Sequence, residues 1–226
     1  MQDKSLYDVN TAGMESVLST NKVLKNTYML LGMTLLFSAV TAGISMAMGL
    51  PHGAALILTL VGFGLLFVVN RMADSSKGLI AIFAFTGVMG ASIGPMLNYY
   101  LSMPGGPALV MQALGGTAVV FFGLSAYALT TRKDFSFMGG FLMVGLLVAV
   151  VAMIANIFLA IPALSLTISA AVVMIMSGLI LFDTSRIING GETNYIRATV
   201  SLYLNIYNLF IRSEERRVGK ECRSRW

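Results

Sequence analysis

Asp183 is the most conspicuous chemical group in the apolar part of this sequence. It lies in the run LILFDTSRII, and a charged group inside such a run is costly and is usually functional. With Arg186 or Arg71 as its partner, it could form a gate that responds to protons or cations. It could equally be an acid near a helix end that reaches the water at the lipid headgroups. The sequence leaves both interpretations open.

A second polar group lies in the segment ATVSLYLNIYNLFI, close to the end of the sequence. Ser201, Asn205 and Asn208 are spaced i, i+4 and i+7, so they share one face of a helix. This face could be a polar lining opposite Asp183. Hydrogen bonds between helices, worth on average about 0.6 kcal/mol each in a membrane, would explain the same residues. We favour the hydrogen-bonding interpretation.

Small residues recur every four positions in one apolar segment. Thr86, Gly90 and Gly94 precede Pro95. This spacing predicts a ridge on which another helix packs closely, and a proline inside a helix can kink it. A pore hinge is the alternative that we favour less.

The composition excludes several classes of protein. One His and one Cys leave almost no material for a zinc site, a thiolate site or His-based nucleophilic catalysis. An aspartyl intramembrane protease needs two acids within the membrane, and the apolar segments hold one. We therefore expect no enzymatic activity, no catalytic residue, no metal site and no cofactor.

The elements that must position these residues are membrane-spanning helices. Of the 226 residues, 57% are hydrophobic and 11% are charged, whereas a soluble domain has about 25% charged residues. This composition also excludes disorder and a nucleic-acid-binding domain. Charged residues are absent from segments 26–70, 78–131 and 135–182, and each can hold two spans of about 20 residues around a Gly- or Pro-containing turn. The sequence predicts spans near residues 27–49, 54–70, 78–101, 108–131, 136–159 and 163–185.

A seventh span begins near Ala198, and its apolar residues end at Ile211. Such a segment rises about 21 Å, which is less than the roughly 30 Å hydrocarbon core, so we expect a truncated seventh helix. Lys and Arg lie in the polar N-terminal tail, 1–25, and in every second loop. The positive-inside rule then makes the N-terminus cytoplasmic. The predicted fold is an all-α membrane protein with seven transmembrane helices in one domain, residues 26–211.

The last residues, 212–226, differ in composition from the rest of the chain. They contain six of the 15 Lys and Arg residues, three of the ten acids, the only Cys and the only Trp. They are either a native basic tail that binds anionic lipid or the translation of a sequencing adapter, whose opening bases AGATCGGAAGAG encode Arg-Ser-Glu-Glu. We favour the adapter, and we expect that the native C-terminus is missing.

Several segments together resemble the bacterial branch of the Bax inhibitor-1 family of seven-span membrane proteins. Their order and spacing along residues 19–211 make the resemblance specific. It implies a multi-pass protein of the bacterial inner membrane that binds and restrains FtsH, a membrane-anchored ATP-dependent protease, with the polar leader as the part that the protease grips. The segments are STNKVLKNTY (19–28), ALGGTA (113–118), LTTRKDFSFMGG (129–140), ANIFL (155–159) and GETNYIRATVSLY (191–203).

The resemblance also bears on the polar residues. In the wider family an Asp of the sixth span pairs with an Asp of the seventh, and the family is associated with a pH-sensitive calcium leak. By position, Asp183 matches the first acid and Asn205 stands at the second. Two neighbouring carboxylates can share a proton, but an Asp and an Asn cannot. We therefore favour the protease modulator, and a pH-sensitive calcium or proton leak is the alternative.

Overall fold

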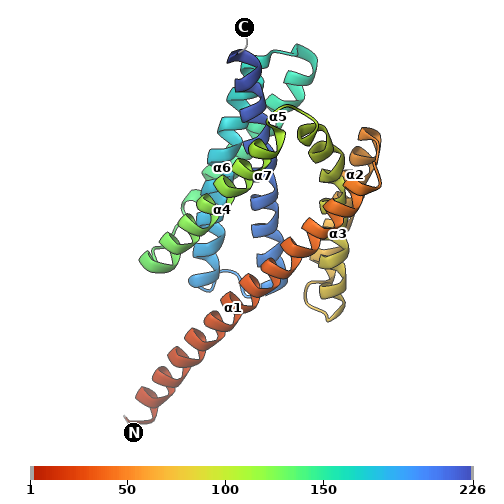
Figure 1. The fold of residues 1–226 in the computed structure, drawn as a ribbon. Helices are drawn as coiled ribbons and strands as arrows, with labels where there is room; N and C mark the ends of the chain where they lie inside the picture. The colour runs from red at the N-terminus through yellow and green to blue at the C-terminus, as the bar shows by residue number, and fades with distance from the viewer. Residues whose placement is uncertain (1–2, 225–226) are drawn as a thin grey trace.

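The computed structural model describes the backbone of residues 3–224 and the side chains of residues 20–213 apart from His52. Within these residues the regular structure consists of seven α-helices without a strand (Figure 1). The helices are α1 (Asp3–Ala47), α2 (His52–Met72), α3 (Lys77–Leu101), α4 (Gly106–Thr131), α5 (Met138–Leu159), α6 (Pro162–Ile188) and α7 (Tyr195–Ser224).

The helix ends confirm the turns that the sequence predicts. Helices α1 to α6 each contain an apolar window long enough to cross a membrane, which makes six candidate spans among the described residues. Gly49 ends the first span at φ 61°, and Gly105 precedes the fourth at φ 80°. Glycine adopts this left-handed conformation without the steric cost that other residues meet, so these turns stop the helices where the sequence indicates.

Two helices are longer than we expected. Helix α1 begins at Asp3, so the polar leader has a helical backbone continuous with the first span. A leader without proline can extend an existing helix and needs no new nucleus. Helix α7 continues past Ile211 to Ser224, because Glu, Lys and Arg are good helix formers. The truncation therefore concerns the apolar length of α7, which is not among the six candidate spans.

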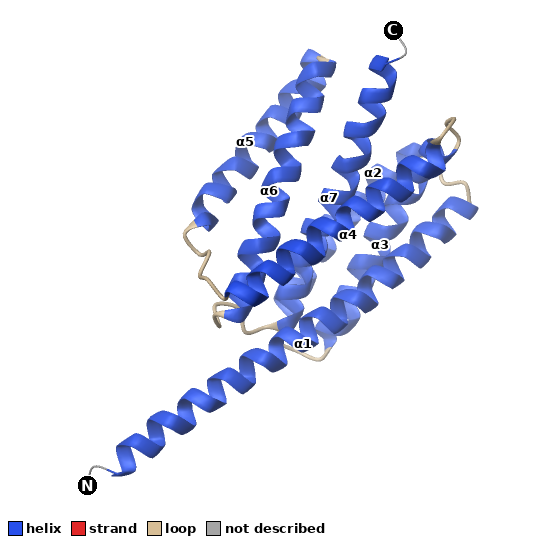
Figure 2. Ribbon diagram, turned by 60° about the vertical axis from the view of Figure 1, so that its left-hand side comes forward, coloured by secondary structure: helices blue, strands red, loops and turns tan. Residues whose placement is uncertain are grey.

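Helix α7 lies inside the bundle, while α2 and α5 lie at its periphery (Figures 1 and 2). It packs against α1, α3, α4 and α6, and its residues between Ile196 and Phe210 are mostly buried. The peripheral helices instead present large apolar side chains outward, such as Phe67 on α2 and Phe158 on α5. These outward faces are what a lipid bilayer would cover.

The small-residue ridge is the packing surface between α3 and α1. A Cβ atom added at Gly90 would overlap the backbone carbonyl of Ser38, and one added at Gly94 would overlap the side chain of Ser45. Thr86, at the start of the ridge, is fully buried. The two backbones approach this closely because the ridge has no larger side chains, which confirms the packing interpretation.

Hydrogen bonds join the Lys- and Arg-containing loops at one end of the bundle, here called the basic end. The Asn194 side chain donates to the carbonyl of Ala73 at 3.0 Å and to Asp74 Oδ1 at 2.8 Å. Arg197 forms an ion pair with the same Asp74, with 2.6 Å between Nη2 and Oδ2. These contacts fix the start of α7 against the turn between α2 and α3. The positive-inside rule assigns this end to the cytoplasm.

Candidate functional site

Asp183 lies on α6, a little more than one turn before the helix ends at Ile188. Its side chain is 8% exposed, and it faces the interior of the bundle. Thr184 and Ile180, its neighbours on the helix, are fully buried. Asp183 is therefore an acid enclosed by protein and not one that reaches the headgroup water.

The carboxylate of Asp183 is held by α7. Asn205 donates a hydrogen bond from Nδ2 to Asp183 Oδ2 at 2.8 Å, and Asn205 itself is 6% exposed. Ser201, one turn earlier on α7, also lies close to this carboxylate. Hydrogen bonds to an ionised acceptor are stronger than those between neutral groups. Two of the three residues of the predicted polar face thus meet Asp183.

Asn208, the third residue of that face, does not join the site. Its Nδ2 donates to the carbonyl of Leu204 at 2.8 Å, within its own helix. The spacing i, i+7 brings residues to one face of a helix, but it does not bring all of them to the same partner. Asn208 therefore satisfies its donor locally.

Neither predicted arginine pairs with Asp183. Arg186 lies 3.6 Å from Glu192, measured from Nη2 to Oε2, because the loop after α6 brings that acid back beside the helix end. Arg71 is exposed near the end of α2. Among the side chains that the structure describes, there are two ion pairs, and neither of them includes Asp183.

The neighbouring face of α7 carries a separate, neutral set of hydrogen bonds. The hydroxyl of Tyr203 lies 2.8 Å from Ser38 Oγ on α1 and donates to the Thr86 carbonyl on α3 at 3.3 Å. The hydroxyl of Tyr207 lies 3.0 Å from Ser92 Oγ on α3. Sequence analysis did not single out Ser38 or Ser92, because their partners lie more than a hundred residues away along the chain.

The site offers a single buried carboxylate framed by hydrogen-bond donors. Tyr28 of α1 approaches it from a third helix, with its hydroxyl 3.5 Å from Thr184 Oγ1. Across the described residues there is no cluster of three His, Cys, Asp or Glu side chains that could hold a metal ion. Chemically, such an arrangement can keep a charge or exchange a proton at Asp183.

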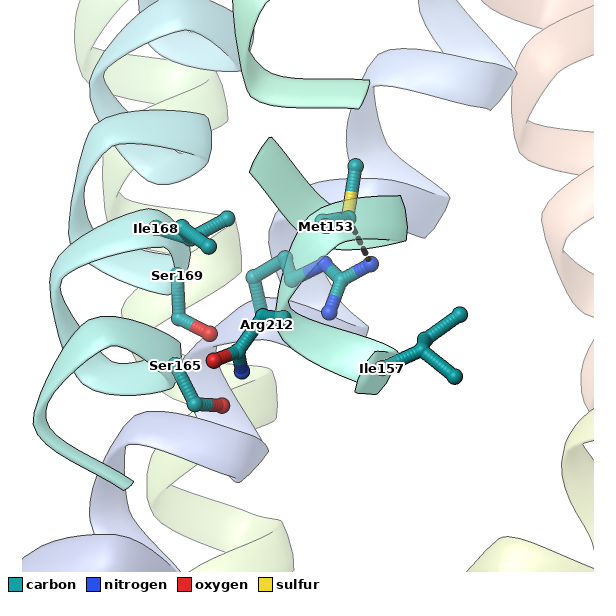
Figure 3. Close-up of a pocket in the computed structure, with 7 residues that line it drawn as sticks. Met153, Ile157, Ser165, Ile168, Ser169 and Arg212 are labelled. Carbon is teal, nitrogen blue, oxygen red and sulfur yellow. Dashed lines mark hydrogen bonds between the residues drawn. The ribbon is translucent and has the colours of Figure 1, made fainter. Parts of the chain in front are cut away.

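A hollow of about 380 Å³ lies between the end of α5 and the start of α6, opposite the basic end, and Figure 3 shows residues that line it. Arg212 extends into it and donates from Nη2 to Met153 Sδ at 2.8 Å. Ser165 and Ser169 of α6 line the hollow. The charge in this hollow thus comes from Arg212, the first residue of segment 212–226, for which we favour the adapter interpretation, so we propose no site there.

Residues 20–212 match the family model described as inhibitor of apoptosis-promoting Bax1, and this range includes all of the predicted membrane domain, residues 26–211. The chain belongs to this Bax1 inhibitor family. The resemblance to its bacterial branch is also confirmed by individual relatives.

One relative within the family is the Escherichia coli K12 protein named modulator of FtsH protease YccA. The two are 59% identical over 197 residues, which are 87% of this chain and 89% of that protein. An uncharacterized membrane protein of Vibrio cholerae is 53% identical over 201 residues, covering 88% and 90% of the two chains. An uncharacterized protein of Pseudomonas aeruginosa is 46% identical over 211 residues, covering 93% and 94%.

The name of one further relative states a location. An Escherichia coli O6:H1 relative, again 59% identical over 197 residues, is named inner membrane protein YccA. Together with the six candidate spans, this confirms that the chain is a multi-pass protein of the inner membrane.

Proposed function

We propose that this chain is a non-enzymatic modulator that binds and restrains an FtsH-type ATP-dependent membrane protease. The observation that carries the proposal is its 59% identity to the Escherichia coli protein named modulator of FtsH protease, along 89% of that protein's length. Similarity at this level along the whole membrane domain supports a shared function and not only a shared fold.

The shape of α1 supports a mechanism by which the protease engages the N-terminal end of this chain. The N-terminal part of α1 extends well beyond the other helices, at the basic end (Figure 2). A helical segment without neighbours is marginal in water, so it unfolds at little cost. A protease that pulls on an accessible end would therefore engage this segment first.

The packing of the membrane-spanning part of α1 supports the proposal that the chain restrains the protease. Helix α1 is in backbone contact with α3 at Gly90 and donates from Ser45 Oγ to the Ala91 carbonyl at 2.7 Å. Ser38 joins it to Tyr203 of α7. A protease that pulls α1 would thus meet resistance from the centre of the bundle. A protein that is easily gripped and slowly extracted occupies the protease and keeps it from other substrates.

Complex formation tests the proposal directly. The full chain and a variant lacking residues 3–18 are each co-purified with an FtsH-type protease in nanodiscs, and their turnover with ATP is followed. We expect the full chain to be retained and slowly degraded, and the deletion to resist degradation while keeping its melting temperature. A variant with residues 3–18 in scrambled order is the matched control, and it should still be engaged. Failure of the full chain to associate with the protease contradicts the proposal.

A pH-sensitive calcium or proton leak is the second candidate function. The observation in its favour is the buried Asp183 between α6 and α7. Its partner is the neutral amide of Asn205, so the pair holds one titratable group. Flux measured in proteoliposomes with and without Asp183→Asn separates this candidate from the modulator.

A further inference from the structure

A pocket of about 400 Å³ opens at the basic end, between three helices that meet there from different parts of the sequence. The start of the first span, the end of α4 and the end of α6 each contribute side chains. The lining residues are Thr20, Asn21, Leu24, Leu129, Arg132, Ile188, Asn189 and Gly190. This pocket shares no lining residue with the Asp183 site.

The polar and apolar lining residues are arranged in the same order on all three helices. Helix α1 runs from the basic end into the bundle, so Asn21 lies nearer that end than Leu24. Helices α4 and α6 run the other way, so Leu129 lies deeper than Arg132 and Ile188 lies deeper than the residue that follows it. The pocket is therefore polar at its mouth and apolar toward the membrane interior, as a phospholipid is polar at its head and apolar below.

The mouth of the pocket carries positive charge without an internal counter-ion. The backbone of Arg132 is fixed at the end of α4. Its φ is 49°, and its N–H donates to the Ala128 carbonyl at 3.0 Å. Within the described side chains, both ion pairs involve other residues. Lys22 and Lys133 are exposed beside the pocket lining, and the nearby Asp134 accepts a hydrogen bond from the backbone N–H of Ser136. A guanidinium is well suited to bind a phosphate oxygen pair.

We propose that this pocket binds the headgroup of an anionic phospholipid, phosphatidylglycerol, with Arg132 on its phosphodiester. Basic pockets between membrane helices at the cytoplasmic side suit anionic lipid headgroups. The side-chain oxygen of Asn21, which is exposed at the mouth, can accept a hydrogen bond from a glycerol hydroxyl. The apolar half of the pocket accommodates the start of an acyl chain, which a free phosphate would leave empty. The proposal does not depend on the protease.

Native mass spectrometry of the purified full chain tests this site, because it counts lipids that remain bound. We expect phosphatidylglycerol to be retained in preference to phosphatidylcholine. Arg132→Gln should weaken retention of phosphatidylglycerol about tenfold, since a hydrogen bond to a charged group is lost. Asn21→Leu, at an exposed position of the mouth, should weaken it less, by about threefold. Lys77→Gln, an exposed cation at the same end but outside the pocket, is the control and should change nothing.

Three results would overturn the proposal. Arg132→Gln could retain the lipid as well as the natural chain, or phosphatidylcholine could be retained equally. Inorganic phosphate could displace the lipid from the natural chain at equal concentration, which would make this a site for free phosphate. If Arg132→Gln does not fold, Asn21→Leu decides, and unchanged retention in that variant contradicts the site.

Discussion

The two polar faces of α7 differ in what they contact, and therefore in what they can do. Toward α1 and α3, Tyr203 and Tyr207 place neutral hydroxyls against neutral partners. Toward α6, Asn205 and the nearby Ser201 contact the carboxylate of Asp183, which makes no ion pair among the described side chains. Polar residues inside a membrane bundle therefore do not by themselves indicate function. A charge held only by neutral donors does, because a proton or cation can change its state.

The face of α7 that contacts α1 and α3 should be more sensitive to changes in packing than the face that contacts α6. In Gly90→Ala the new methyl group would overlap the Ser38 carbonyl, so α1 must move away from α3 and from Tyr203. Overpacking of this kind costs about 1–3 kcal/mol, and here it should reach the upper part of that range because the opposing atom belongs to the backbone. Equilibrium unfolding in detergent measures the loss.

Gly115→Ala is the matched control for this prediction. A methyl group there meets no neighbouring atom within 4 Å in the described part of the chain. Replacing a helical glycine by alanine should then be neutral or stabilise by up to about 1 kcal/mol. Equal destabilisation by the two substitutions would contradict the close α1–α3 contact.

The face of α7 that contacts Asp183 should be more sensitive to loss of a hydrogen-bond donor than the face that contacts α1 and α3. Asn205→Leu leaves the buried carboxylate of Asp183 with one donor fewer, which should cost about 2 kcal/mol of unfolding free energy. Tyr203→Phe removes two bonds between neutral groups, each worth about 0.6 kcal/mol, so it should cost less, about 1 kcal/mol. Thermal melting of both variants ranks the two faces. A larger loss in Tyr203→Phe would reverse the comparison.

A second carboxylate at the charged face should create a pH response. In Asn205→Asp, two carboxylates would lie at hydrogen-bonding distance and could share one proton. Removing that proton as the pH rises leaves two like charges, so α6 and α7 should separate and the variant should lose stability above neutral pH. Asn208→Asp adds an acid on the same helix, at a residue whose side chain bonds to the Leu204 carbonyl and not to Asp183, and it should not respond. Melting temperature and calcium flux as functions of pH measure both variants.

Flux through the natural chain can contradict the interpretation that a pH response needs two carboxylates. With Asn205 in place we expect little dependence of flux on pH. A steep pH-gated flux in the natural chain that Asp183→Asn abolishes would mean that one acid is enough. The leak would then be the better account of function.

Substitution of Asn208 should change the free energy of unfolding least. Its amide bonds within α7, so Asn208→Leu removes no side-chain hydrogen bond between helices among the described residues. We expect a change within about 0.5 kcal/mol in unfolding free energy, as for substitutions away from buried networks. A loss as large as that of Asn205→Leu would show that the polar face acts as one unit.

Much of the fold follows from the sequence because the membrane imposes simple rules. Charge-free segments and Gly- or Pro-containing turns predict the six spans, and each turn ends a helix near its predicted place. The Gly90 ridge follows from spacing alone. The helical leader does not, because whether a polar segment continues a helix depends on the helix that it joins and not on its own composition.

The site was predicted less completely. The meeting of Asp183 with Asn205 could be expected from position and family resemblance. The partner of Arg186 could not, because it depends on how the loop to α7 returns Glu192. The bond between Ser38 and Tyr203 joins residues 165 positions apart, and no local pattern signals it.

The central claim is that the chain restrains a membrane protease by occupying it. The most direct measurement is the rate at which a purified FtsH-type protease in nanodiscs degrades another membrane substrate as increasing amounts of this chain are added. We predict that the rate falls as the chain saturates the protease, and that the variant lacking residues 3–18 leaves the rate unchanged. A substrate degradation rate that stays constant at all amounts of the full chain would contradict the claim.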